Sequence, residues 1–164
     1  MFAPFEKTGD IAADAEPLAT ALQALADPDS IATLANAASL LNWYLDGINW
    51  VGFYLWNADD GELVLGPFQG LPACIRIKPG RGVCGTAYER GETQRIEDVA
   101  AFPGHIACDA ASRSELVVPL AAEDGTLLGV LDIDSPEVGR FSAADADAME
   151  AFCNVLGPLL SAAS

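Results

Sequence analysis

Basic residues are scarce in this chain. It has 8 Lys and Arg against 24 Asp and Glu, which gives a net charge of −16. This balance argues against DNA, RNA and anionic membranes as partners, because each of them is bound by basic surface. No apolar run reaches the roughly 18 residues of a membrane span. The N-terminal sequence MFAPFEKTGD lacks the basic start and long apolar stretch of a signal peptide, so we expect a cytoplasmic protein.

The sequence also lacks closely spaced cysteine pairs. Structural zinc sites usually contain pairs such as Cys-x2-Cys, whereas Cys74, Cys84 and Cys108 are separated by ten and then 24 residues. Zinc is therefore the less favoured alternative, and we assign no metal ligands. In a reducing cytoplasm a group of cysteines is more often catalytic or metal-binding than structural, so thiol redox chemistry is favoured.

Helical spacing appears at both ends of the chain. The first helix is expected over 15–25, with Pro17 near its start. Ser30 is the expected N-cap of a second helix that Gly47 ends, and Ser142 and Asp145 form a capping box for a C-terminal helix. The expected buried face of the second helix comprises Ile31, Leu34, Ala38, Leu41 and Leu45, and that of the last helix Met149, Phe152, Leu156 and Leu159.

Between these helices the pattern changes to short runs that are rich in β-branched and aromatic residues. The runs are NWVGFYLW, ELVLGPFQ, ACIRIK, SELVVPL and LLGVLDID, with a short helix from about Val83 to Gly91 and a long loop over 98–113. This order predicts a single α+β domain, whose mostly antiparallel sheet carries the N- and C-terminal helices on one face. We place the N-terminal helices in 8–46, the sheet and site in 48–135, and the last helix in 142–160.

The local sequence allows two interpretations of Cys74 and two of Cys84. Alternation in ACIRIK places Cys74 on a polar strand face, away from Ile75 and Ile77, although a small buried strand residue is the alternative. Cys84 opens the short helix beside Arg81, and both the helix dipole and this cation would lower the pKa of its thiol. Equally, Cys84 fills space at a glycine-rich turn.

The other two cysteines differ in their neighbours. Cys108 lies in the long loop three residues after His105, which could act as its base if the segment forms a helical turn. A loop histidine that hydrogen-bonds to the backbone is the more frequent case. Cys153 follows Phe152 on the last helix, where core packing is expected.

Two of the expected strands contain carboxylates among apolar residues. Glu115 is on one face of its strand, and Leu116 and Val118 are split from it by alternation onto the other face. In the next strand, Asp132 and Asp134 share a face with Leu128 and Val130. Either these two aspartates mark an exposed strand end, or they bind a ligand ammonium or supply an acid of raised pKa.

Trp50, Gly52 and Tyr54 share one face of an earlier strand, and Val51, Phe53 and Leu55 share the other. Half-buried packing is one interpretation of this pattern. The other is an aromatic box for an apolar or thioether group, with Gly52 leaving a gap between the two rings.

Over nearly its whole length the chain resembles the free methionine-(R)-sulfoxide reductases, which are single GAF-type domains. The resemblance is strongest in NWVGFYL, GPFQGLPACIRI, GRGVCGTA, FPGHIACDAASRSELVVPL and GVLDIDSP. Generic GAF domains lack the three cysteines at this spacing. The resemblance implies reduction of free L-methionine (R)-sulfoxide without a metal, flavin or nicotinamide, with thioredoxin as the reductant and a homodimer as a possible assembly.

The resemblance also implies roles for individual residues. Cys108 corresponds to the nucleophile, Cys74 to the resolving cysteine that forms a disulfide with it, and Cys84 to an accessory cysteine. Trp50 and Tyr54 match the aromatic part of the pocket, and the acidic part is matched by Glu115, Asp132 and Asp134.

Two non-enzymatic alternatives share the same scaffold. One is a GAF module that binds a small ligand such as a cyclic nucleotide, which predicts a linked effector domain for which 164 residues leave no room. The other is a redox sensor whose cysteines oxidise as a signal. Sustained production of methionine would distinguish the enzyme from both.

Overall fold

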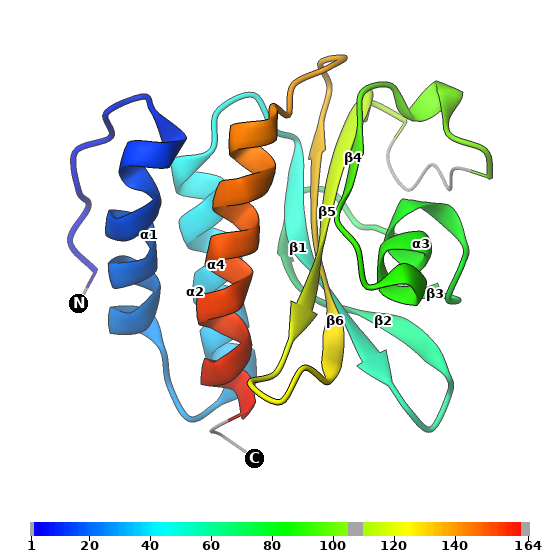
Figure 1. Ribbon diagram of the computed structural model, residues 1–164, viewed down its shortest axis with the longest axis horizontal. Coiled ribbons are helices and arrows are strands. Elements are labelled where there is room, and N and C mark those ends of the chain that lie inside the picture. Colours follow the sequence, from blue (N-terminus) through cyan, green and yellow to red (C-terminus); the bar gives the residue numbers. More distant parts are fainter. Residues whose placement is uncertain (1, 105–109, 162–164) are drawn as a thin grey trace.

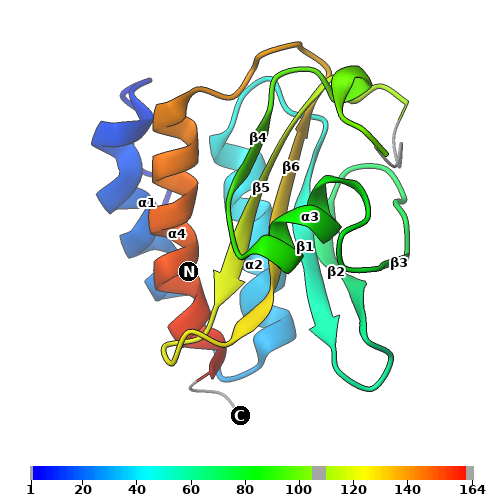
Figure 2. The same ribbon diagram turned by 45° about the vertical axis from the view of Figure 1, so that its right-hand side comes forward.

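The computed structural model describes residues 2–104 and 110–161. Its elements form layers, with a helical layer on one side of a central sheet and a short helix on the other (Figures 1 and 2). The helices are α1 (Ile11–Leu25), α2 (Ser30–Tyr44), α3 (Gly82–Arg90) and α4 (Ala143–Ser161), with a 3-10 turn at Val99–Ala101. The strands are β1 (Trp50–Asn57), β2 (Glu62–Gln69), β3 (Arg76–Ile77), β4 (Gln94–Ile96), β5 (Ser114–Ala121) and β6 (Leu127–Ser135).

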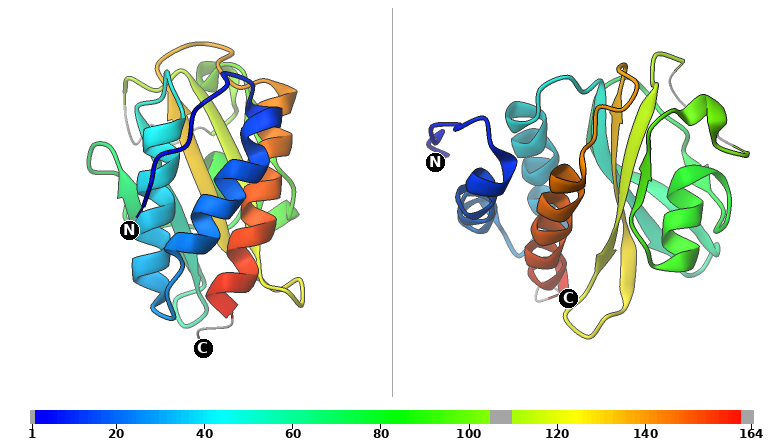
Figure 3. Two further views of the ribbon diagram at one scale, coloured as in Figure 1. Left: turned by 90° about the vertical axis from the view of Figure 1, so that its left-hand side faces the viewer. Right: turned by 45° about the horizontal axis from the view of Figure 1, so that its top comes forward.

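The six strands form one sheet in the order β3-β2-β1-β6-β5-β4, and every neighbouring pair is antiparallel. Figure 3 shows α2 and α4 against the sheet with α1 outside them, and α3 on the opposite face. The predicted α+β arrangement is therefore confirmed. The second face is not left open, because α3 covers part of it.

Strand alternation divides the buried side chains into two groups. On the helical side, Val51 and Phe53 of β1 pack with Leu116, Val118 and the apolar faces of α2 and α4. On the α3 side, a smaller cluster consists of Trp50, Tyr54, Leu63, Ile77, Val83, Cys84, Ala87, Val117 and Val130. The predicted separation of Trp50 and Tyr54 from Val51 and Phe53 is confirmed.

One predicted face is wrong because β6 contains a bulge. Leu120 pairs with Gly129 and Ala121 pairs with Leu127, so Leu128 is an additional residue without a partner position in β5. An extra residue reverses the alternation beyond it. Leu128 therefore packs with the helical-side core, not on the face of Val130 and Asp132.

The helix starts also differ from the prediction. Asp10 caps α1 through Ala12 N, which places Pro17 inside the helix, and Asp29 rather than Ser30 caps α2 through Ile31 N and Ala32 N. Ile31 is exposed, contrary to the predicted buried face. An aspartate one residue before a serine offers the stronger acceptor for the first free N–H groups.

The predicted end of α2 is wrong, whereas the predicted start of α4 is right. The second helix ends at Tyr44, and its C-cap Leu45 is extended, so Gly47 follows the end rather than making it. The predicted capping box of α4 is confirmed. Asp145 Oδ2 accepts from Ser142 N at 2.7 Å, and Ser142 Oγ accepts from Asp145 N at 3.1 Å.

The remaining errors in the predicted strands concern the two edges of the sheet. Only Arg76 and Ile77 of the predicted ACIRIK run form a strand, and Ile75 is exposed while Ile77 is buried on the α3 side. The three-residue strand β4 was not predicted. Both are edge strands of only two or three residues, which is too short to show alternation.

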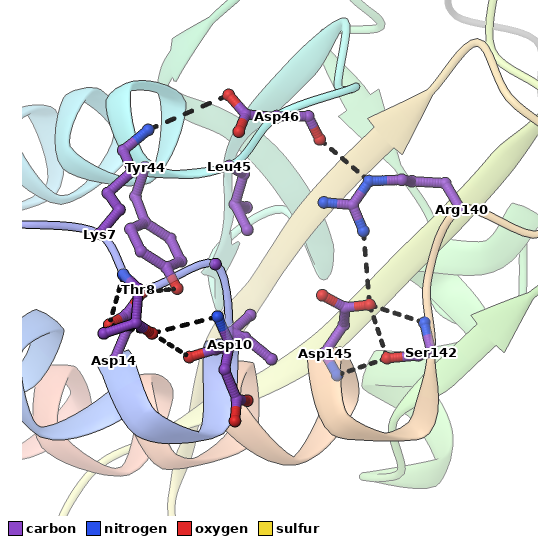
Figure 4. Close-up of a pocket in the computed structure, with 12 residues that line it drawn as sticks. Lys7, Thr8, Asp10, Asp14, Tyr44, Leu45, Asp46, Arg140, Ser142 and Asp145 are labelled. Carbon is purple, nitrogen blue, oxygen red and sulfur yellow. Dashed lines mark hydrogen bonds and ion pairs between the residues drawn. The ribbon is translucent and has the colours of Figure 1, made fainter.

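A polar junction joins the N-terminal segment, the end of α2 and the start of α4 (Figure 4). Asp14 is buried, and it accepts hydrogen bonds from Tyr44 Oη at 2.9 Å and from Thr8 Oγ1 at 2.9 Å. Burial opposes its charge, but these hydrogen bonds outweigh burial and hold the pKa of Asp14 below its ordinary value. Nearby, Arg140 bridges the backbone carbonyl of Asp46 and the Asp145 carboxylate.

No helix within residues 2–104 and 110–161 combines the length and the apolar character that a membrane span requires.

Gly157 lets α4 approach the end of β5. A methyl group on Gly157 would overlap with the backbone carbonyl of Ala121, which cannot move like a flexible side chain. We expect Gly157→Ala to lower the free energy of unfolding by about 1–3 kcal/mol through overpacking, measured by urea denaturation. Ala151→Ser on the exposed face of the same helix is the control, with an expected change within about 0.5 kcal/mol. Equal stability of the two variants would contradict this close approach.

Candidate active site on the second face of the sheet

Aromatic rings form one wall on the α3 side of the sheet. The ring of Trp50 stacks with those of Phe68 and Tyr54, with centroid distances of 5.2 and 6.0 Å. Trp50 Nε1 donates to the carbonyl of Leu71 at 3.1 Å, and Tyr54 Oη donates to the carbonyl of Cys74 at 3.0 Å. The polar atoms of both rings therefore hold the segment that carries Cys74, and only their apolar surfaces remain for other contacts.

The expected gap above Gly52 is filled. A methyl group at this position would overlap with Phe68 Cβ and would lie 2.8 Å from Trp50 Cη2. Gly52 pairs with Phe68 across the strands, so glycine permits the two rings to close over the sheet. Phe68 was not among the predicted site residues, although its position opposite a glycine flanked by aromatics is a signal that could have found it.

A thiol and two carboxylates meet beside this wall. Cys84 comes from α3, Glu115 from β5 and Asp132 from β6, and one ligand atom of each lies within 4.8 Å of the others. The Cys84 thiol donates to Glu115 Oε1 at 3.9 Å. All three residues are buried, and Asp132 Oδ1 has no hydrogen-bond partner in the described part of the chain. Such a donor set is able to hold a metal ion as well as to exchange protons.

Strand register explains why these residues are neighbours. Asp132 lies opposite Gly52 of β1 and Val117 of β5, and Asp134 lies opposite Trp50 and Glu115. The two aspartates therefore share a face, as predicted, and the structure shows that this is the aromatic face of the sheet. Asp134 is partly exposed near the strand end, whereas Asp132 is buried.

The electrostatic surroundings of Cys84 are opposite to those predicted. Burial, and then the negative charges of Asp132 and Glu115, raise the pKa of the Cys84 thiol well above its ordinary value. Arg81 is exposed at the N-cap of α3, so water screens its charge. Two adjacent carboxylates and complete burial outweigh the helix dipole, and Cys84 is a protonated thiol at neutral pH.

Asp132 is perturbed in the same direction. Burial is the largest cause, followed by the charge of Glu115, and together they raise the pKa of Asp132 well above its ordinary value. Two carboxyl groups this close share protons as a pair. The site therefore contains a carboxyl group that keeps its proton to a higher pH than an ordinary aspartate does.

The remaining cysteines occupy three different situations. Cys74 does not belong to a strand, since it precedes β3 in an irregular, partly buried segment, and it is disulfide-bonded. Cys153 is a free thiol in the helical-side core, as predicted. Cys108, with His105 and Asp109, lies outside the described residues.

Comparison with known proteins identifies the scaffold. The GAF domain model matches residues 31–161. Protein YtsP of Bacillus subtilis is 52% identical over 98% of this chain and 99% of its own length. The free methionine-R-sulfoxide reductase of Escherichia coli is 60% identical over 115 residues, which cover 70% of this chain and 68% of that protein.

A solved structure agrees over almost the entire chain. The X-ray structure of free methionine-R-sulfoxide reductase from Neisseria meningitidis in complex with its substrate matches with a TM-score of 0.93 and 42% identity, covering 99% of this chain and 98% of that one. This chain belongs to the free methionine-R-sulfoxide reductases, a family of GAF domains. For this family member, the described geometry places the thiol of Cys84 and the carboxylates of Glu115 and Asp132 in one buried cluster.

The raised pKa predicts slow alkylation of Cys84. We expect iodoacetamide to modify Cys84 in the folded protein near neutral pH at least about tenfold more slowly than an ordinary thiol, since each unit of pKa lowers the thiolate fraction tenfold. The rate should rise only in strongly alkaline solution. Mass spectrometry of peptides measures it, with the urea-unfolded protein as the reference. Equal rates in the folded and unfolded protein would contradict the assignment of a buried, protonated thiol.

Proposed function

We propose that this protein reduces free L-methionine (R)-sulfoxide to methionine with its cysteine thiols. The observation that carries the proposal is the buried cluster of Cys84, Glu115 and Asp132 beside the Cys74 segment. This cluster lies on a scaffold that matches the substrate complex of a free methionine-R-sulfoxide reductase with a TM-score of 0.93. A buried acid next to a thiol suits the removal of oxygen from sulfur.

In the proposed first step, the Cys108 thiolate attacks the sulfoxide sulfur. The oxygen passes to Cys108, which becomes a sulfenic acid, and methionine leaves. The sulfoxide oxygen needs a proton because it is a poor leaving group. Overall, one sulfoxide and one thiol are converted to methionine and one sulfenic acid, so the sulfur of methionine is reduced and that of Cys108 is oxidised.

In the proposed second step, Cys74 attacks the sulfenic acid, and a disulfide and water are formed. The disulfide-bonded state of Cys74 supports its role as the resolving cysteine. A thioredoxin-type dithiol then reduces the bond by exchange and becomes a disulfide itself. Cys84 is the accessory thiol in this scheme, because its raised pKa does not suit a nucleophile.

Asp132 is the proposed proton donor. Its pKa is raised by burial and by the charge of Glu115, and a carboxyl group that stays protonated near neutral pH is able to serve as a general acid. Glu115 and Asp134 are the proposed ligands of the substrate ammonium. The faces of Trp50 and Tyr54 contact the S-methyl end, since their polar atoms are already engaged with backbone carbonyls.

The nucleophile is tested by turnover. We expect Cys108→Ser to abolish release of methionine from free methionine sulfoxide in the presence of reduced thioredoxin, because serine does not take up the oxygen. Cys153→Ala, which changes the core thiol on α4, should retain activity. Release of methionine by Cys108→Ser at the wild-type rate would overturn the assignment, and absence of turnover by the wild type would favour a ligand-binding or redox-sensing module.

The acid is tested by the pH profile. A general acid must be protonated, so kcat/KM should fall as pH rises through the raised pKa of Asp132. We expect Asp132→Asn to lower kcat/KM by about 10²–10⁴-fold and to remove this alkaline decline. Asp147→Asn, an exposed position on α4, is the matched control. A variant that is slower but keeps the same alkaline decline would assign the proton to another group.

A further inference from the structure

The cluster of Cys84, Glu115 and Asp132 has the composition of a metal site. Three different elements supply one ligand atom each, and these atoms lie within 4.8 Å of one another. The side chain of Asp132 is 6% exposed, and its Oδ1 has no hydrogen-bond partner among the described residues. Buried polar atoms in native structures are almost always satisfied, so this oxygen is an independent sign that the site accepts a further group.

The donor set selects the kind of metal. A thiolate is a soft ligand that suits Zn²⁺, whereas Mg²⁺ and Ca²⁺ prefer oxygen alone. We propose that Cys84, Glu115 and Asp132 bind one Zn²⁺ ion. Three protein ligands leave the fourth tetrahedral position open for water or for another ligand.

The geometry needs little adjustment for this ion. Zn–S bonds of about 2.3 Å and Zn–O bonds of about 2.0–2.2 Å place neighbouring ligand atoms about 3.5 Å apart in a tetrahedron. Cys84 Sγ and Glu115 Oε1 are separated by 3.9 Å, and the largest separation in the cluster is within 4.8 Å. Side-chain movements of about 1 Å bring the ligand atoms to these separations. Small changes in the side-chain torsion angles are enough for movements of this size.

Binding of a cation changes the protonation of the cluster. As ligands, two carboxylates and a thiolate carry three negative charges, and burial makes each of them costly unless it is bound to the metal. On binding, the sulfur–zinc bond forms, and the thiol proton passes to solvent together with any proton shared by the carboxyl groups. The ion therefore replaces protons as the partner of the cluster.

Zinc bound here has a consequence for the reaction. It occupies Asp132 and Glu115, so the acid and one ammonium ligand of the proposed function are no longer available. Zn²⁺ is then a reversible inhibitor of sulfoxide reduction rather than a cofactor. This consequence rests on the proposed function, whereas the binding itself does not.

Cobalt provides a direct spectroscopic test. The protein is kept with Cys74 in its disulfide, so that Cys84 and Cys153 are the free cysteines of the described part of the chain. We expect Co²⁺ to produce a thiolate-to-cobalt charge-transfer band that one equivalent of Zn²⁺ abolishes by displacement and that excess Mg²⁺ does not. Cys153→Ala should keep the band, and Cys84→Ser should lose it.

The carboxylates are tested with the cysteine intact. Asp132→Asn and Glu115→Gln should each weaken Zn²⁺ binding at least about tenfold. Mutation of residues that only hydrogen-bond to metal ligands already lowers metal affinity by about tenfold or more, and loss of a ligand should cost at least as much. Competition with a chromophoric chelator measures the affinity, and circular dichroism verifies folding. These two variants carry the test if Cys84→Ser does not fold. A band that persists without Cys84, or wild-type affinity in both carboxylate variants, would overturn the site.

Turnover assays separate the two proposals. Addition of Zn²⁺ should inhibit release of methionine, and a chelator should restore it. Zinc binding at the cluster without inhibition would refute the inhibitory consequence. Failure of the wild type to release methionine under any condition would refute the proposed function, whereas the cobalt spectrum would still decide the metal site.

Discussion

The position of β6 between β1 and β5 is the constraint on which the rest of the molecule depends. Antiparallel pairing on both sides leaves alternate residues of three strands on each face. One face packs on α2 and α4 and contains the apolar core. The other face receives Asp132 beside Glu115, with the aromatic wall on one side and α3 above it. A shift of one residue in this register would exchange the core with the site.

Burial on the second face decides the chemistry of the cluster. A carboxyl group beside another carboxylate, both removed from water, retains its proton at a higher pH. The same surroundings hold Cys84 as a thiol. A site that keeps protons on these groups is suited to donating one to an oxygen atom, and also to exchanging protons for a soft divalent cation. Both proposals therefore follow from one cause, the enclosure of negative charge by a sheet and a short helix.

Much of this arrangement could be predicted from periodicity. The alternation of Trp50 and Tyr54 against Val51 and Phe53, and of Glu115 against Leu116, identified the correct faces. The capping box of Ser142 and Asp145 identified the start of α4. Periodicity failed at Leu128, where a bulge reverses alternation, and at the short edge strands β3 and β4. A strand of two or three residues is too short for its alternation to be recognised in the sequence.

The sequence by itself determined the α+β order, the polar face of each central strand and the number of thiols that are available. Only the tertiary structure decided the electrostatic state of Cys84. Local sequence offered a helix N-terminus and Arg81, which favour a thiolate, but folding places Glu115 and Asp132 against the sulfur and leaves Arg81 in water. The physical reason is that the pKa of a buried group depends on desolvation and on charges that meet it through space, and these charges come from strands far away in the chain.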